Sequence, residues 1–175
     1  MNKKIYFDIV GGISGDMSVA ALLGQGTTLG ELKKELKKIK VTGYKLDTRI
    51  VERGHSRAIK FDVSISKNRN FSYNQILRLI KASGLSKNSK SLFYRIYRSL
   101  FESELKVHGH KHDDMKFHEV GDIDSIIDIA SVSICLDKLG ISEILYSVIP
   151  LSFKIAPATF ELLAGKEVFF TGNLY

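Results

Sequence analysis

The sequence predicts an α/β domain with a mixed sheet that contains one antiparallel hairpin and carries flanking helices. Residues 3–10 alternate apolar and polar side chains like a strand, and they lead through a Gly-rich turn into a helical pattern. Two segments rich in β-branched and aromatic residues, 44–53 and 58–66, flank the short turn "GHSR", which is typical of a hairpin. Helical and strand patterns are interleaved over the rest of the chain, so we expect a mixed sheet.

The helices are marked by their first and last residues. One helix is expected at 16–24, directly after the Gly-rich turn. The next two, at 28–40 and 72–84, begin with Thr or Ser and carry Glu or Gln three residues later, which is a capping box. A long helix should run from about residue 86 to residue 106 or slightly beyond, and a fifth from 126 to the glycine at 140.

The last part of the chain returns to strands. The segment "EILYSVI" is predicted as a buried strand because it is an almost continuous apolar run. "APATFELLAG" is predicted as a short helix with Pro157 in its first turn, and "EVFF" as a final strand.

The composition is that of a globular domain. With 175 residues, 44% of them hydrophobic and 26% charged, we expect one domain over 1–175. The single cysteine, Cys135, falls within an apolar helical pattern, which indicates a buried structural thiol and a reduced, cytoplasmic location. No stretch approaches the roughly eighteen apolar residues of a membrane span, so no membrane association is expected.

The formal net charge of +7 raises the question of nucleic acid. The lysines between residues 33 and 40 flank Leu32, Leu36 and Ile39, which repeat at helical spacing. They therefore indicate the solvated side of an amphipathic helix. Nucleic-acid binding stays the weakest of the functional hypotheses, and its signature would be an affinity that falls steeply with salt.

The Gly-rich turn is the first candidate site. Gly12 and Gly15 allow backbone N–H groups to converge on a ligand, while Asp8 ends the strand and Ser14 and Asp16 open the helix. The spacing fits neither the dinucleotide fingerprint nor the P-loop. The alternative is structural, with Ser14 or Asp16 capping the helix and the glycines permitting a tight turn.

The second candidate site is the segment "HGHKHDDMKFHE". An extended backbone would place His108, His110 and His112 on one side, whereas a continuing helix would align only the first with the third. Imidazoles bind nickel, zinc, copper or iron. The alternative for these histidines is an exposed polar loop that binds no metal. His118 stands beside Glu119 and close to further acids, which favours a ligand or acid/base role over a histidine satisfied by the backbone.

Two acids of the following helix complete this set. Asp124 and Asp128 are four residues apart and so lie on one helix face. Such a pair costs about 0.2–0.5 kcal/mol in an isolated helix unless a cation lies between the carboxylates. The helix N-terminus offsets part of that cost for Asp124. The alternative to this dipole effect is a cation that neutralises both acids, either a metal ion or a Lys or Arg from another element.

The motifs "DIVGGISGDM", "FHEVGDIDSIIDI" and "APATFELLAGKEV" occur in this order along the chain. With these motifs the chain resembles the N-terminal half of the LarC family, the nickel insertion proteins, over almost its whole length. The resemblance implies a cytoplasmic nickel chelatase of the lyase class that inserts nickel into pyridinium-3,5-bisthiocarboxylic acid mononucleotide. This cyclometallation consumes CTP and forms the nickel-pincer nucleotide cofactor of lactate racemase and related enzymes.

The resemblance also implies roles for individual residues. We expect catalytic roles for some acids, contacts to the nucleotide precursor from the Gly-rich turn, and nickel ligation by histidines and one further acid. The acids expected to be catalytic are Asp8, Asp16, Glu119 and Asp124. The residues expected to contact the precursor are Gly12, Ser14 and Gly15. The expected nickel ligands are His108, His110, His112, His118 and Asp128.

The chain departs from the family pattern at several points. Ile9 stands where a proline is usual, Lys116 where a second histidine is usual, and only "SFKI" replaces a Gly-rich segment with a His-Gly pair. The family's C-terminal domain, expected to bind CTP with a divalent cation, would begin after residue 175. Two hypotheses follow: an N-terminal part that works with a separate CTP-binding domain or subunit, or a non-catalytic nickel- or zinc-binding module for storage or delivery. Homo-oligomerisation stays open.

A hypothesis about location follows from the α/β class. Ligands of open α/β sheets lie beyond the carboxyl ends of the strands, where the first strand delivers the Gly-rich turn. We therefore expect Asp8 and Asp16 to share one cleft with the acids of the later helix and with His118 and Glu119. The segment from His108 to His112 is expected to be a loop that acts as a flap over this cleft.

Overall fold

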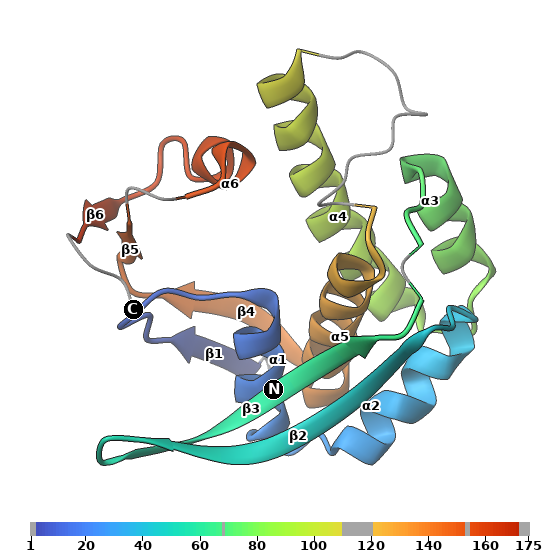
Figure 1. Cartoon of the computed structure of the whole chain (residues 1–175), viewed down its shortest axis with the longest axis horizontal. Helices are drawn as coiled ribbons and strands as arrows, with labels where there is room; N and C mark the ends of the chain where they lie inside the picture. Colours follow the sequence, from blue (N-terminus) through green and yellow to red (C-terminus); the bar gives the residue numbers. More distant parts are fainter. Residues whose placement is uncertain (1–2, 68, 110–120, 153–154, 172–175) are drawn as a thin grey trace.

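The computed structural model describes residues 3–67, 69–109, 121–152 and 155–171. Figure 1 shows a group of helices packed on a long hairpin, with the first strand and the C-terminal strands beside them. In chain order the elements are β1 (Lys3–Phe7), α1 (Gly15–Leu23), α2 (Leu29–Leu36), the 3₁₀ turn η1 (Lys37–Ile39), β2 (Tyr44–Arg53), β3 (Ser56–Ile65), α3 (Tyr73–Ala82), α4 (Lys87–His108), α5 (Ile123–Leu139), β4 (Ile141–Tyr146), β5 (Ile149–Leu151), α6 (Pro157–Leu162) and β6 (Val168–Phe170).

The predicted α/β class and its antiparallel hairpin are confirmed. In the described residues the strands form three two-stranded sheets: β1 with β4, β2 with β3, and β5 with β6. The β2–β3 pair is antiparallel and in continuous register from Tyr44 opposite Ile65 to Arg53 opposite Ser56. The other two pairs are parallel, so β1 is joined to a strand from the far end of the sequence.

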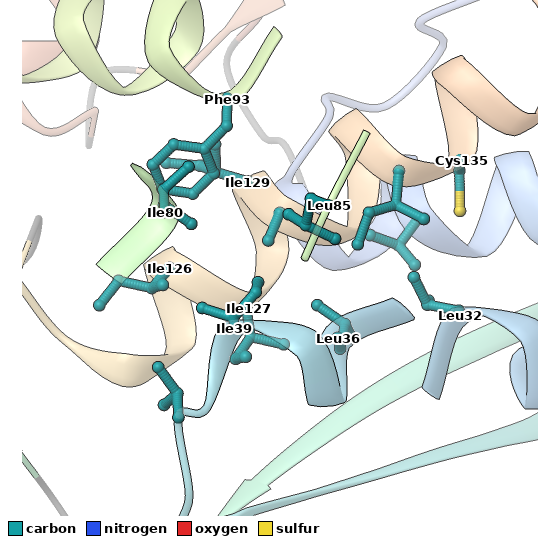
Figure 2. Packing of buried hydrophobic residues seen from close by; sticks show 14 of the residues in the cluster. Leu32, Leu36, Ile39, Ile80, Leu85, Phe93, Ile126, Ile127, Ile129 and Cys135 are labelled. Atoms are coloured by element: carbon teal, nitrogen blue, oxygen red, sulfur yellow. The ribbon is translucent and has the colours of Figure 1, made fainter. Parts of the chain in front are cut away.

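The core lies around α5, which is apolar on nearly all sides. Ile126, Ile127 and Ile134 are at most 1% exposed, because α1, α2 and α4 all pack against this helix. Figure 2 shows Leu36 of α2 and Phe93 of α4 approaching it from different elements. A helix that is hydrophobic all round is stable only when it is enclosed in this way. The enclosure fixes the start of α5 against the start of α1.

The predicted capping boxes form. The Thr28 hydroxyl accepts from the Glu31 N–H at 3.2 Å, and the Glu31 carboxylate accepts from the Thr28 N–H at 2.9 Å. Ser72 and Gln75 repeat this exchange at the start of α3. Cys135 is fully buried, as predicted, and burial raises the pKa of its thiol to about 12.

The expectation of one buried strand at "EILYSVI" is wrong. The segment is divided between β4 and β5, and in β4 the side chains of Ile144, Leu145 and Tyr146 are 45%, 45% and 47% exposed. Within the described residues β4 pairs only with β1, and α5 packs against β4. These three side chains nevertheless stay exposed, unlike those of a parallel sheet that is buried on both faces.

None of the helices within the described ranges is both long enough and apolar enough to cross a membrane.

Candidate functional site

The Gly-rich turn is anchored to the sheet before it reaches α1. The Phe7 carbonyl accepts from the Ser147 N–H at 3.0 Å, and the buried Ile9 donates its N–H to the Ser147 hydroxyl at 2.8 Å. Gly12 then adopts a left-handed φ of 98°, a conformation that residues with a Cβ rarely take. The turn thus delivers Ser14 to the N-cap position of α1 and Asp16 to its first turn.

The first turn of α1 is organised around the Asp16 carboxylate. Its Oδ1 accepts from the Met17 N–H at 2.9 Å and from the Ser14 hydroxyl. Ser14 occupies the N-cap position, but its side chain accepts no bond from a helix N–H. The hydroxyl of Ser14 therefore serves to hold Asp16, and it is Asp16 that accepts a backbone N–H of this turn.

The start of α5 is held by its own set of contacts. Asp122 is the N-cap residue, and its Oδ1 accepts from the Asn70 side-chain amide at 3.0 Å. The Phe71 N–H donates to the Gly121 carbonyl at 2.9 Å. These contacts fix α5 against the segment before α3, and they set the direction in which Asp124 and Asp128 project from the first two turns.

Gly15 brings the two helix starts into direct contact. A Cβ at this position would lie 2.3 Å from Asp128 Oδ2 and 2.8 Å from Asp128 Cβ, distances that real Cβ atoms do not show. Only glycine permits this approach, so the packing of α1 on α5 by itself accounts for a glycine here. As a result, residues from two motifs far apart in the sequence become neighbours.

The acids at this junction, Asp16, Asp124 and Asp128, form what we term the acid cluster. Burial, together with the charges of Asp124 and Asp16, raises the pKa of Asp128 to about 7, although the Asp16 N–H acts in the opposite direction. Burial, followed by Asp16 and Asp122, also raises the pKa of Asp124. Asp128 Oδ1 is buried without a hydrogen-bond partner. In the described part of the chain no Lys or Arg pairs with these three carboxylates.

This arrangement attracts cations but does not form a closed coordination shell. Partly desolvated carboxylates that raise one another's pKa are stabilised when a cation arrives. Over the residues that the structure describes, however, no three or more His, Cys, Asp or Glu side chains are placed to hold a metal ion. Any tightly bound metal would therefore need further ligands.

The expectation for His108 is wrong in one respect. This residue is the last of α4 and not part of a loop, with its Nε2 3.3 Å from Oε2 of the buried Glu104. Gly109 takes a left-handed φ of 66° and ends the helix.

Of the other predicted residues, one has no described link to the acid cluster and four lie outside the described residues. Asp8 lies exposed just beyond β1 and is not among the groups that raise the pKa of Asp124 or Asp128. His110, His112, His118 and Glu119 lie outside the described residues.

Two basic residues near the acid cluster were missed in the sequence. A cavity of about 760 Å³ extends from Ser14 and Asp16 along α1 to the hairpin, where Arg49 and Lys60 line it. Charged side chains on an amphipathic strand ordinarily indicate a face exposed to solvent, so neither residue stood out as a binding residue. The signal that could have found them is the pairing of two cations: in the hairpin register Arg49 of β2 lies directly opposite Lys60 of β3.

Comparison with known proteins assigns the chain to a family. The model of a family described as "Nickel insertion protein" matches residues 5–170. Two curated relatives are named as nickel insertion proteins. The one from Citrifermentans bemidjiense is 39% identical over 93% of this chain, and the one from Pelobacter propionicus is 40% identical over 96% of it. The pyridinium-3,5-bisthiocarboxylic acid mononucleotide nickel insertion protein of Geobacillus kaustophilus is 36% identical over 95% of it.

The chain spans about half the length of these curated relatives, 46% of each. No solved structure matches it. The family match covers both the Gly-rich turn and the start of α5, which are the two parts that the fold joins through Gly15. The chain belongs to the nickel insertion protein family.

Proposed function

We propose that this chain is the nickel-receiving part of an enzyme that inserts nickel into pyridinium-3,5-bisthiocarboxylic acid mononucleotide, forming the nickel-pincer nucleotide cofactor. A separate domain or subunit binds CTP with a divalent cation. The Geobacillus kaustophilus relative is named for insertion into this compound. The observation that carries the proposal is the acid cluster: Asp16, Asp124 and Asp128 converge at one helix junction without a described cation to neutralise them.

The chemistry of nickel suits this cluster. Ni²⁺ is bound by carboxylate oxygen and imidazole nitrogen, and a dication offsets the mutual repulsion of neighbouring carboxylates. The buried, unpartnered Oδ1 of Asp128 is the oxygen that gains most from a new partner. His118 and Glu119 precede the N-cap residue of α5 by only a few positions, so they are our candidates for the remaining ligands.

Proton transfer follows from the same geometry. Asp128, with a pKa of about 7, is partly protonated at neutral pH, and it releases its proton when nickel binds. In the cyclometallation step nickel takes the electron pair of a C–H bond of the ring, and the proton leaves to a base. Asp16 and Asp124 are the carboxylates that flank Asp128 and are our candidates for this base.

A reconstitution experiment tests the proposal. The chain is mixed with the C-terminal part of a full-length relative, nickel, CTP and the mononucleotide, and nickel incorporation is followed by mass spectrometry. We expect Asp128→Asn to lower incorporation by roughly 10–100-fold, the range typical of a perturbed metal site. The matched control is Glu143→Gln, an exposed acid in β4 that pairs with Lys4. Incorporation no higher than with the partner alone would refute the proposal, and stoichiometric nickel binding without a CTP-dependent product would favour the storage module.

A further inference from the structure

The cavity beside the acid cluster has the size and lining of a ligand site. Its volume of about 760 Å³ lies within the roughly 300–1,000 Å³ of small-molecule pockets. One wall is the side of α1, with Met17 and Ala20, and the other is the hairpin, with Val51, Ala58 and Ile59. Figure 1 shows that β3 crosses α1, and the two elements are in contact. Mostly apolar walls of this kind fit a flat ring better than they fit a hydrated ion.

The hairpin wall carries an excess of positive charge. Arg49 and Lys60 are directly opposite one another in the β2–β3 register, and both line the cavity. They share one acid, because Asp62 lies 3.4 Å from Arg49 Nε and 2.8 Å from Lys60 Nζ. Like charges directly opposite in a sheet are unfavourable, and one carboxylate neutralises only one of the two cations. An anionic group bound here would neutralise the second.

The other end of the cavity reaches the acid cluster. Ser14 and Asp16 belong to its lining, and the Ser14 hydroxyl donates to the Asp16 carboxylate. Asp16 also acts on the pKa of Asp124 and Asp128. One part of a ligand in the cavity would therefore lie beside Arg49 and Lys60, and another part would lie beside Asp16 and the acid cluster.

We propose that this cavity binds the pyridinium mononucleotide, with its phosphate on Arg49 and Lys60 and its metal-accepting ring toward Asp16. This assignment rests on the proposed function, since nickel held by the acid cluster must meet the ring. The phosphate is assigned to the basic wall because a guanidinium and an ammonium recognise phosphate oxygens, whereas the acid cluster repels them. The apolar walls hold the ring, and the positive charge of a pyridinium is compatible with Asp16.

Binding of nicotinic acid mononucleotide, measured by titration calorimetry without nickel or CTP, tests the assignment. This probe carries a pyridinium ring, a carboxylate and a phosphate. We expect the Arg49→Gln, Lys60→Gln double variant to bind it at least 10-fold more weakly. Nicotinic acid riboside, which lacks the phosphate, should bind weakly and equally to both proteins. The matched control is Arg57→Gln, an exposed arginine of the same hairpin that does not line the cavity.

A second variant separates binding from folding. Asp62→Asn removes the acid that Arg49 and Lys60 share, so we expect it to bind the mononucleotide several-fold more tightly, a gain that a purely structural role would not produce. Unchanged affinity in both variants, or no binding by the unmodified chain at millimolar probe, would overturn the assignment. Asp128→Asn should leave this binding intact while lowering nickel incorporation. Failure of nickel insertion with intact binding would therefore count against the proposed function and not against the cavity.

Discussion

Asp128 and Asp137 lie on the same helix, yet their surroundings shift the pKa values of their carboxyl groups in opposite directions. Burial by itself would raise the pKa of Asp137, but hydrogen bonds from Ser86, Ser89 and Asn88 outweigh it and hold that pKa below its usual value. Asp128 is raised to about 7, because burial and neighbouring acids outweigh one backbone N–H. The helix dipole predicts the reverse order, since Asp137 is nearer the C-terminus. The groups packed against each carboxylate, and not its place on the helix, decide its state.

The comparison separates a structural acid from a candidate functional one. Asp137 accepts from the Ser89 hydroxyl at 2.7 Å and also from the Ser86 hydroxyl, so it ties α5 to the start of α4. Asp128 leaves one buried oxygen unpartnered and packs against the Gly15 backbone. Substitutions at these positions, at Gly15 and at an exposed acid test this difference.

Gly15→Ala should lower the free energy of unfolding by about 2–3 kcal/mol, the upper range for overpacking. The added Cβ would overlap Asp128 Oδ2 and Cβ, so α1 and α5 must separate. Urea denaturation measures the loss. Gly11→Ala is the matched control, because a Cβ there meets nothing within 4 Å. Combining Gly15→Ala with Asp128→Ala should recover part of the loss, and equal effects of the two glycine variants would contradict the close contact.

Asp137→Ala should lower the free energy of unfolding by about 1–2 kcal/mol, because two serine hydroxyls lose a charged acceptor. The pKa of Asp137 is lowered in the folded protein, so its contribution is present above the unfolded value of 3.8 and is lost as pH falls through the folded pKa. The difference between variant and unmodified chain should therefore shrink in acid. A difference that persists unchanged at pH 2 would show that the lost packing, and not the charge, is responsible.

Asp128→Asn should have the opposite sign and stabilise the metal-free chain by about 1 kcal/mol at pH 8, less than the full pKa shift implies because solvent screens a partly exposed group. The pKa of Asp128 rises from 3.8 to about 7 on folding, so the ionised carboxylate destabilises the fold progressively as pH rises through this interval. Near pH 4 the variant and the unmodified chain should be equally stable. Thermal unfolding at both pH values checks this, and a destabilised variant at pH 8 would mean that Asp128 has a partner.

Glu143→Gln sets the scale of a solvent-exposed acid. Glu143 lies 2.6 Å from Lys4 Nζ, but both side chains are about half exposed. Surface ion pairs contribute only about 0–1 kcal/mol, so we expect a change below about 0.5 kcal/mol at pH 7 in urea denaturation. A larger loss would mean that the β1–β4 pair depends on this contact, and Glu143 would then be unsuitable as the activity control.

The sequence predicted what local chemistry decides. Thr28 and Ser72 begin helices because each cap needs only residues within one turn, and the hairpin follows from its own alternation. The approach of Asp16 to the acids of α5 was expected from the sheet rule, whereas the reason for Gly15 depends on a neighbour more than 100 positions away. Cover by other elements is equally non-local, so the exposure of β4 and the cavity at Arg49 were not predicted.

The bond from Ile9 to Ser147 joins positions 138 residues apart, and it anchors the turn that carries Asp16. Contacts of such long sequence separation form late, because the intervening chain must close first. At about 5–20 residues per second, a ribosome needs roughly 6–22 seconds to add the about 110 residues between Asp16 and Asp128. During that interval the apolar side of α1 has no α5 to cover it. The nascent chain therefore passes through a stage in which the Gly-rich turn and α1 have been synthesised but α5, on which α1 packs, has not. Chaperone binding or aggregation would compete with folding during this stage.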